Sequence, residues 1–122
     1  MVSLPEKTLQ EGKVKDLELF QEIQNLRRRG ADVALVTVVE TQGSTPREQG
    51  AKMAILPNGS CLGTIGGGCV EARIKTTALK ILIEERANRT ITAHLDDEFG
   101  TKDGDVCGGT MTMLVECLPG LA

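Results

Sequence analysis

The chain has 122 residues, a length that suits one domain with one modest core, and its composition is ordinary for a globular protein, with 40% hydrophobic and 25% charged residues. Its formal net charge is -3, and only Phe20 and Phe99 are aromatic. Such a chain offers neither a basic face that follows phosphates nor a base-stacking platform, which argues against nucleic acid as a partner.

The four cysteines form no C-x-x-C pair, and His94 is the single histidine, so zinc-type spacing is absent. The polar N-terminus has no signal-peptide core, and no apolar run reaches membrane-spanning length. We therefore expect a cytoplasmic protein with reduced thiols and no membrane contact. The cysteines are Cys61, Cys69, Cys107 and Cys117.

Residues 1–12 predict a loose N-terminal arm that is closed by Gly12, and a helix is expected from Val14 to Arg29. Gly30 is a natural stop for that helix. The expected buried face of the helix consists of Leu17, Phe20, Ile23 and Leu26, which recur at helical spacing.

A strand is expected over 33–40, and its apolar start without alternation indicates cover on both faces. The polar segment 41–50 predicts a loop. Two short strands follow over 51–56 and 60–65, and Pro57-Asn58-Gly59 between them is typical of a hairpin turn.

Helical spacing returns from Val70 to about Ala87. Leu79 and Ile83 widen the apolar stripe of this helix, so considerable cover is expected over it. The expected common face consists of Val70, Ile74, Ala78, Ile81 and Leu82.

Alternation predicts a strand over 90–95 that places His94 on the polar face, as a surface residue. The segment 96–109 is rich in glycine and acidic residues, and its spacing does not fit an EF-hand, so a solvated loop is expected. The last strand is expected over 110–118, with Cys117 in an apolar row as an inert core residue. Together these elements predict an α/β fold: one domain with a mixed β-sheet of about five strands and two main helices.

Three glycine-containing loops carry the residues that could bind a ligand or take part in chemistry. The first is Gly43-Ser44-Thr45-Pro46-Arg47, which offers backbone amides, two hydroxyls and a guanidinium that can grip phosphate. Ordinary turn chemistry is the alternative for this Ser-Thr-Pro sequence.

The second loop is Gly63-Thr64-Ile65-Gly66-Gly67-Gly68-Cys69-Val70-Glu71, which runs from a short strand into a helix. Three glycines without Cβ atoms let a ligand approach the backbone, and the following helix directs its N-terminus at them. A helix start would also lower the pKa of Cys69. The alternative is a tight strand-to-helix turn with a buried cysteine.

The third loop is Cys107-Gly108-Gly109, just before the last strand. Neither a P-loop nor a dinucleotide fingerprint is present. Strand ends followed by glycine loops are where ligands bind in α/β sheets, so the three loops together indicate a ligand site.

Residues 36–74 resemble the XdhC/CoxI family, accessory proteins of xanthine dehydrogenase and related molybdenum hydroxylases. The motifs G-S-T-P-R, G-A-x-M, G-x-I-G-G-G-C-x-E and C-G-G occur in that family's order, and the likeness covers most of the chain after about residue 15. In this sequence they are Gly43–Arg47, Gly50–Met53, Gly63–Glu71 and Cys107–Gly109.

The resemblance implies a chaperone that binds and protects the molybdenum cofactor, helps a cysteine desulfurase to install its terminal sulfido ligand, and delivers it to an apo molybdenum hydroxylase similar to xanthine dehydrogenase. The phosphate of the pterin would lie against Gly66–Gly68 or Arg47, and Cys69 or Cys107 would hold sulfur or contact molybdenum. The cofactor-binding set implied is Gly43, Ser44, Thr45, Arg47, Gly66, Gly67, Gly68, Cys69, Glu71, Cys107, Gly108 and Gly109.

Two other functions remain open from the residues alone. One is a thiol-based sulfur-transfer enzyme that uses Cys69 and Cys107, although only His94 and Glu71 offer a base for it, and this scarcity argues against independent turnover. The other is a docking module for a larger dehydrogenase. The sequence leaves undecided the hydroxylase served, the mono- or dinucleotide form of molybdopterin, and the oligomeric state, for which a homodimer is one option.

Many family members continue into a C-terminal Rossmann-like domain. For residues 1–122 we expect a single XdhC/CoxI-like domain without it. Whether the sequence is a natural single-domain member or a piece of a longer protein stays open.

Overall fold

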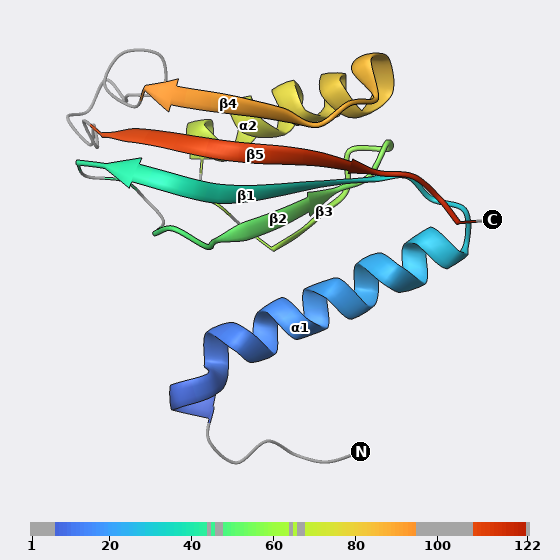
Figure 1. Cartoon of the computed structure of the whole chain (residues 1–122), viewed down its shortest axis with the longest axis horizontal. Coiled ribbons are helices and arrows are strands. Elements are labelled where there is room, and N and C mark those ends of the chain that lie inside the picture. Colours follow the sequence, from blue (N-terminus) through green and yellow to red (C-terminus); the bar gives the residue numbers. More distant parts are fainter. Residues whose placement is uncertain are drawn as a thin grey trace.

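The computed structural model describes residues 7–43, 45, 48–63, 65, 68–94 and 109–121, with only the backbone described at 7–14 and 68–70. The expected α/β domain with two main helices and five strands is confirmed (Figure 1). In chain order the elements are α1 (Lys7–Arg28), β1 (Val33–Gln42), β2 (Lys52–Ile55), β3 (Cys61–Gly63), α2 (Gly68–Lys80) with a π-helical turn (Ile81–Glu85), β4 (Arg89–His94) and β5 (Thr110–Leu118).

The five strands form one sheet in the order β3-β2-β1-β5-β4, with β1 at its centre. Each of the four strand pairings is antiparallel, so the expected mixture of parallel and antiparallel strands is not found. The connections explain the difference: β2 and β3 form a tight hairpin, and β5 returns beside β1 in the opposite direction. The predicted hairpin turn is confirmed, since the Leu56 and Ser60 backbones bond across it at 2.9 Å.

The first helix begins at Lys7, so the expected loose arm over 1–12 is wrong for residues 7–12. Helix-forming residues surround Gly12, and one interior glycine costs a helix only about 1 kcal/mol. The predicted stop at Gly30 is confirmed, because Gly30 adopts a φ of 92° directly after the helix.

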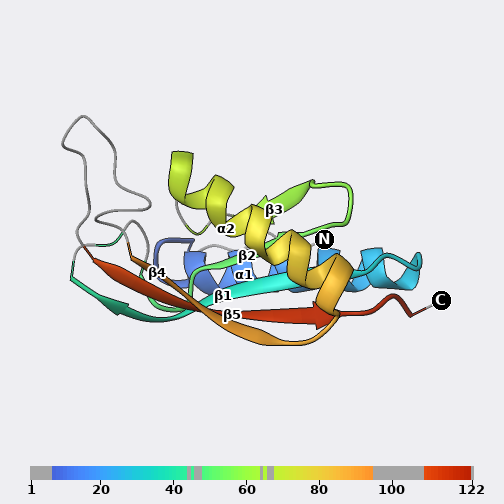
Figure 2. The same cartoon turned by 90° about the horizontal axis from the view of Figure 1, so that it is seen from above.

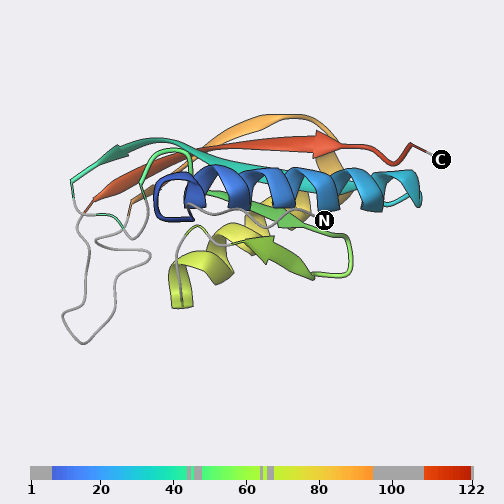
Figure 3. The ribbon, with the colours of Figure 1, turned by 90° about the horizontal axis from the view of Figure 1, so that it is seen from below.

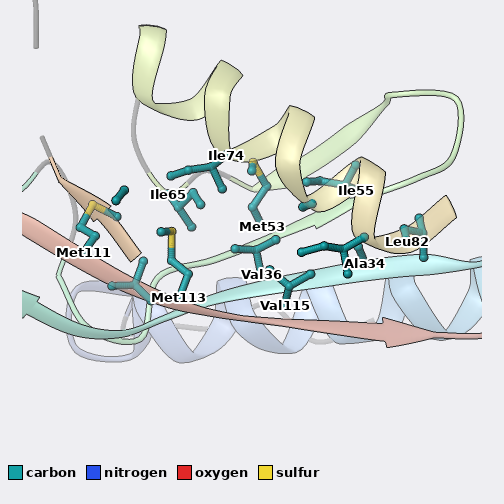
Figure 4. Close-up of a cluster of buried hydrophobic side chains, with 14 residues drawn as sticks. Ala34, Val36, Met53, Ile55, Ile65, Ile74, Leu82, Met111, Met113 and Val115 are labelled. Carbon is teal, nitrogen blue, oxygen red and sulfur yellow. The ribbon is translucent and has the colours of Figure 1, made fainter. Parts of the chain in front are cut away.

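One face of the sheet packs against α2 and forms the larger core (Figures 2 and 4). From β1 it takes Ala34, Val36 and Val38, and from α2 it takes Ile74 and Ala78, as the helical spacing predicts. Met53, Met111 and Met113 fill this core instead of aromatic rings. The expectation for Ile83 is wrong, because its side chain is 52% exposed on the outer side of the π-turn.

The opposite face of the sheet packs against α1 (Figure 3). Its core contains Val33, Leu35 and Ala54 beneath Ile23, which confirms the expected cover on both faces of β1. Leu17 and Phe20 do not reach this core and are 57% and 43% exposed, so their expected burial is wrong. The described core contacts of α1 come from Leu19, Ile23 and Leu26.

Candidate functional site

The strand register brings the first and third glycine loops to one end of the sheet, which we call the glycine-loop end. There β1 ends at Gln42 opposite Thr110, the first residue of β5, and His94 at the end of β4 also pairs with Thr110. β3 ends at Gly63 opposite Met53, which pairs with Val36, so the second loop leaves the sheet beside the middle of β1 and not at its Gln42 end. The first and third loops therefore meet through antiparallel pairing and not at the carboxyl ends of parallel strands, whereas the register alone does not bring the second loop to them.

Gly63 is the residue that turns the chain out of β3. Its φ is 79°, a left-handed value that side chains other than glycine rarely adopt. A Cβ at this position would lie 2.7 Å from the carbonyl oxygen of Lys52 in β2, which is backbone and cannot move aside cheaply. Glycine is thus required here by the fold, at the first position of the G-x-I-G-G-G-C-x-E motif.

Ile65 anchors the loop between β3 and α2. Its side chain is fully buried among Met53, Ile74, Met111 and Met113 (Figure 4). The sequence prediction placed Ile65 at the end of a strand over 60–65, whereas β3 stops at Gly63. In the sequence, this role is indicated by a single aliphatic residue that stands among glycines. Its side chain fixes the loop to the core.

The second helix begins at Gly68, two residues earlier than expected, so Cys69 belongs to its first turn. This placement puts the Cys69 backbone where unpaired helical N–H groups gather. Glu71 also lies in the first turn, and its half-buried carboxylate interacts favourably with the helix dipole. Gly66 and Gly67 lie outside the described residues.

The first loop leaves β1 through a bulge. The register of β1 with β5 shifts between Val38 and Glu40, and bulges often occur beside functional sites, where they redirect a strand. The Gln49 side chain donates a hydrogen bond to the Val39 carbonyl at 3.1 Å, which holds the returning segment against the bulge. Gly43 follows with a φ of 74°, and Thr45 is half-buried. Ser44 and Arg47 lie outside the described residues.

The third loop enters β5 through Gly109, which is buried directly before Thr110. Thr110 pairs with Gln42, so this glycine lies close to Gly43 at the end of the two central strands. Cys107 and Gly108 lie outside the described residues.

Cys117 lies toward the end of the sheet opposite the first and third glycine loops, and Cys61 is level with it at the start of β3, two residues before Gly63. Cys61 pairs with Ile55, which pairs with Ala34, which in turn pairs with Cys117. Burial raises the pKa of the Cys117 thiol, although a backbone hydrogen bond with Ala87 and the nearby Arg86 charge act in the opposite direction. A raised pKa keeps this thiol protonated at neutral pH, which agrees with the expectation of an inert residue, but the side chain is half-buried and not fully in the core.

We expect Cys69 to be the first thiol that an alkylating reagent modifies at neutral pH, because a helix start lowers a thiol pKa and burial raises that of Cys117. Substoichiometric iodoacetamide followed by peptide mass spectrometry measures the order. Raising the pH should increase the alkylation of Cys117 as its thiolate forms. Earlier modification of Cys61 or Cys117 at neutral pH would contradict the helix-start argument.

His94 is exposed at the end of β4, which confirms it as a surface residue. In the described ranges, His, Cys, Asp and Glu side chains do not gather in groups of three or more that could hold a metal ion. Neither helix in the described part of the chain combines the length and apolar character that a membrane crossing requires.

Comparison with known proteins identifies the family. Residues 26–94, more than half of the chain, match the model of the XdhC and CoxI family. The chain belongs to this family. The match includes two of the three glycine loops, those at Gly43 and Gly63, and the whole of α2.

Two proteins of Escherichia coli K12 are similar to this chain. YqeB, an uncharacterized protein, is 32% identical over 99 residues, which are 81% of this chain and 18% of YqeB. PaoD, a molybdenum cofactor insertion chaperone, is 40% identical over 53 residues, which are 43% of this chain and 17% of PaoD. The chain thus spans less than a fifth of the length of each of these relatives.

A crystal structure of a xanthine dehydrogenase from Bacillus halodurans has a similar fold, with a TM-score of 0.64 and 28% identity. The similarity covers 79% of this chain and 29% of that one. The fold derived from the strand register is therefore also found in a solved structure.

Proposed function

We propose that this domain binds the molybdenum cofactor at the glycine-loop end and acts as an accessory protein that delivers it to an apo molybdenum hydroxylase of the xanthine dehydrogenase type. The observations that carry the proposal are the register that places Gly43 beside Gly109, and the burial of Ile65 of the second loop in the same core cluster as Met111 near the start of β5. Membership of the XdhC and CoxI family and the likeness to PaoD, a molybdenum cofactor insertion chaperone, support the same role.

The part of the cofactor that these loops suit is the phosphate of the pterin. Backbone N–H groups in glycine loops and at the start of α2 bind anions without side-chain obstruction. Glu71 in the first turn weakens that attraction, so we assign the balancing positive charge to Arg47, whose planar guanidinium grips phosphate in a bidentate fork. Ser44 and Thr45 add hydroxyl donors beside it. Because every form of molybdopterin carries this phosphate, the mono- and dinucleotide forms share the contact.

The molybdenum end of the cofactor would lie against a thiol of the same loops. Cys69 and Cys107 are the two cysteines in glycine loops, whereas Cys61 and Cys117 lie within the strands β3 and β5. Soft thiolates suit a soft metal centre, so one of this pair holds sulfur or contacts molybdenum. A cysteine desulfurase would then install the terminal sulfido ligand while this domain holds the cofactor.

Replacing Arg47 tests the phosphate contact. We expect Arg47→Ala to weaken binding of molybdenum cofactor by about tenfold to a hundredfold, because losing a hydrogen bond to a charged group costs roughly 1.5–3 kcal/mol. Arg47→Lys, which keeps the charge but not the fork, should lose less. Titration calorimetry with cofactor released from a purified molybdenum enzyme measures both.

Delivery is measured in the same series by adding each cofactor-loaded variant to an apo molybdenum hydroxylase and following its activity. The parent chain should activate the hydroxylase, and Arg47→Ala should do so less at equal protein concentration. Equal cofactor affinity of Arg47→Ala and the parent would exclude Arg47 from the site. A parent chain that binds cofactor but never activates a hydroxylase would separate binding from delivery and refute the accessory role.

A further inference from the structure

In the described part of the chain, β4 forms one edge of the sheet. Among the described strands it pairs only with β5 (Figure 1), and its six residues keep one continuous register with neither bulge, proline nor lysine. The opposite edge, β3, has only three residues and ends at the left-handed Gly63. Short edges, bulges, prolines and lysines are the usual protection against further pairing, so β3 is protected and β4 is not.

We propose that β4 pairs with β4 of a second copy of this chain, antiparallel about a two-fold axis that passes through Thr92. The pairing joins the two five-stranded sheets into one continuous sheet. A two-fold axis perpendicular to the sheet keeps each face on the same side, so residues of the same face meet across the new interface.

The side chains of β4 are complementary to themselves in this register. On the face away from α2, Thr92 meets the partner's Thr92, and Thr90 meets the partner's His94. The sheet already contains a pair of this kind, because the Thr92 and Thr112 hydroxyls lie 3.5 Å apart across β4 and β5. On the α2 face, half-buried Ile91 meets the partner's Ala93, which extends the apolar core across the interface.

The charges of β4 do not oppose pairing with a second copy. Arg89 is the only Asp, Glu, Lys or Arg residue in β4. Its guanidinium forms an ion pair of 2.6 Å with the Glu85 carboxylate. Antiparallel pairing places the two copies of Arg89 at opposite ends of the interface, so no like charges oppose each other.

This pairing leaves the proposed cofactor site of each copy accessible. The pairing itself does not require bound cofactor. The His94 end of β4 lies at the glycine-loop end, and it meets the Thr90 end of the partner's strand. The two glycine-loop ends therefore point in opposite directions, and each copy remains accessible to its own partners.

Introducing a charge at the two-fold axis tests the pairing. Light scattering after size exclusion should give the parent chain twice the 13.0 kDa mass of one copy. Thr92→Lys and Thr92→Glu should each weaken self-association more than about a hundredfold and elute at the mass of one copy, because each places like charges opposite each other. Mixing the two variants should restore the doubled mass, which also shows that both are folded.

Thr76→Lys is the matched control, since Thr76 is an exposed threonine on α2 and its replacement should leave the doubled mass unchanged. A parent chain that stays single at millimolar concentration would overturn the proposal and leave the edge to an extended segment of another protein. Single variants that keep the doubled mass would place the interface elsewhere. Single variants that separate but do not recombine on mixing would refute the register through Thr92.

Discussion

Gly63→Ala should lower the stability of the domain by about 3 kcal/mol or more, which corresponds to a fall in Tm of about 10 °C or more. Two costs add at this position. The φ of 79° is strained for any residue with a Cβ, and that Cβ would lie 2.7 Å from the Lys52 carbonyl oxygen. Relief would require β3 to move away from β2, which breaks the hairpin that leads into the second glycine loop. Calorimetric unfolding measures the change.

Gly59→Ala is the matched control for this experiment. Gly59 has a φ of 91°, but an added Cβ would meet nothing within 4 Å. It therefore reports backbone strain alone and should cost only about 1 kcal/mol. Equal losses for the two variants would show that the close approach to Lys52 is unimportant and that the first glycine of the motif serves only to turn the chain.

Gly67→Val should abolish binding of molybdenum cofactor while the domain remains folded. A branched side chain in the glycine run would obstruct a phosphate bound to the backbone, which we expect to weaken binding by at least about a hundredfold. Strain can also arise at this residue, and about 1–3 kcal/mol would be a serious part of a stability of about 5–15 kcal/mol. Thermal unfolding must therefore accompany the cofactor titration.

Gly59→Val provides the comparison for this second prediction, because it introduces the same side chain in the β2–β3 hairpin turn, away from the glycine-loop end. It should lose stability without losing cofactor affinity. A folded Gly67→Val variant that binds cofactor like the parent would mean that the glycines only turn the chain, and the anion-binding role of the second loop would be wrong.

Where the chemistry of single residues decides local structure, the sequence predicts the fold well. The last strand occupies 110–118 as expected, because Met111, Met113 and Val115 alternate without interruption. The Pro57-Asn58-Gly59 turn likewise forms the expected hairpin.

The errors arise where tertiary contacts decide. Leu17 and Phe20 have core-like spacing, yet the sheet contacts described for α1 begin at Leu19 and leave both exposed. Lys52 instead fastens this part of the helix, with its ammonium 3.1 Å from Asp16 and 6.0 Å from the Phe20 ring centre. No periodicity in the sequence reveals that a lysine holds the helix there.

The sequence predicts each loop of the candidate site, but only the strand register shows which loops lie together. Nothing in the sequence states that Gln42 and Thr110 are partners, and that pairing places Gly43 beside Gly109. Ile65 was also missed, because its burial depends on the space that Met53, Met111 and Met113 leave under α2. The motif residues were visible in the sequence, whereas the contacts that hold them together come from segments far apart in the chain.

The most direct test of the central claim is the pterin content of the purified protein. The parent chain and Gly67→Val are produced in a host that makes molybdenum cofactor, and bound cofactor is released, oxidised to its fluorescent pterin and counted per chain. We expect nearly one pterin per folded parent chain and almost none on folded Gly67→Val. A parent chain with no more pterin than an unrelated protein from the same host would contradict the account.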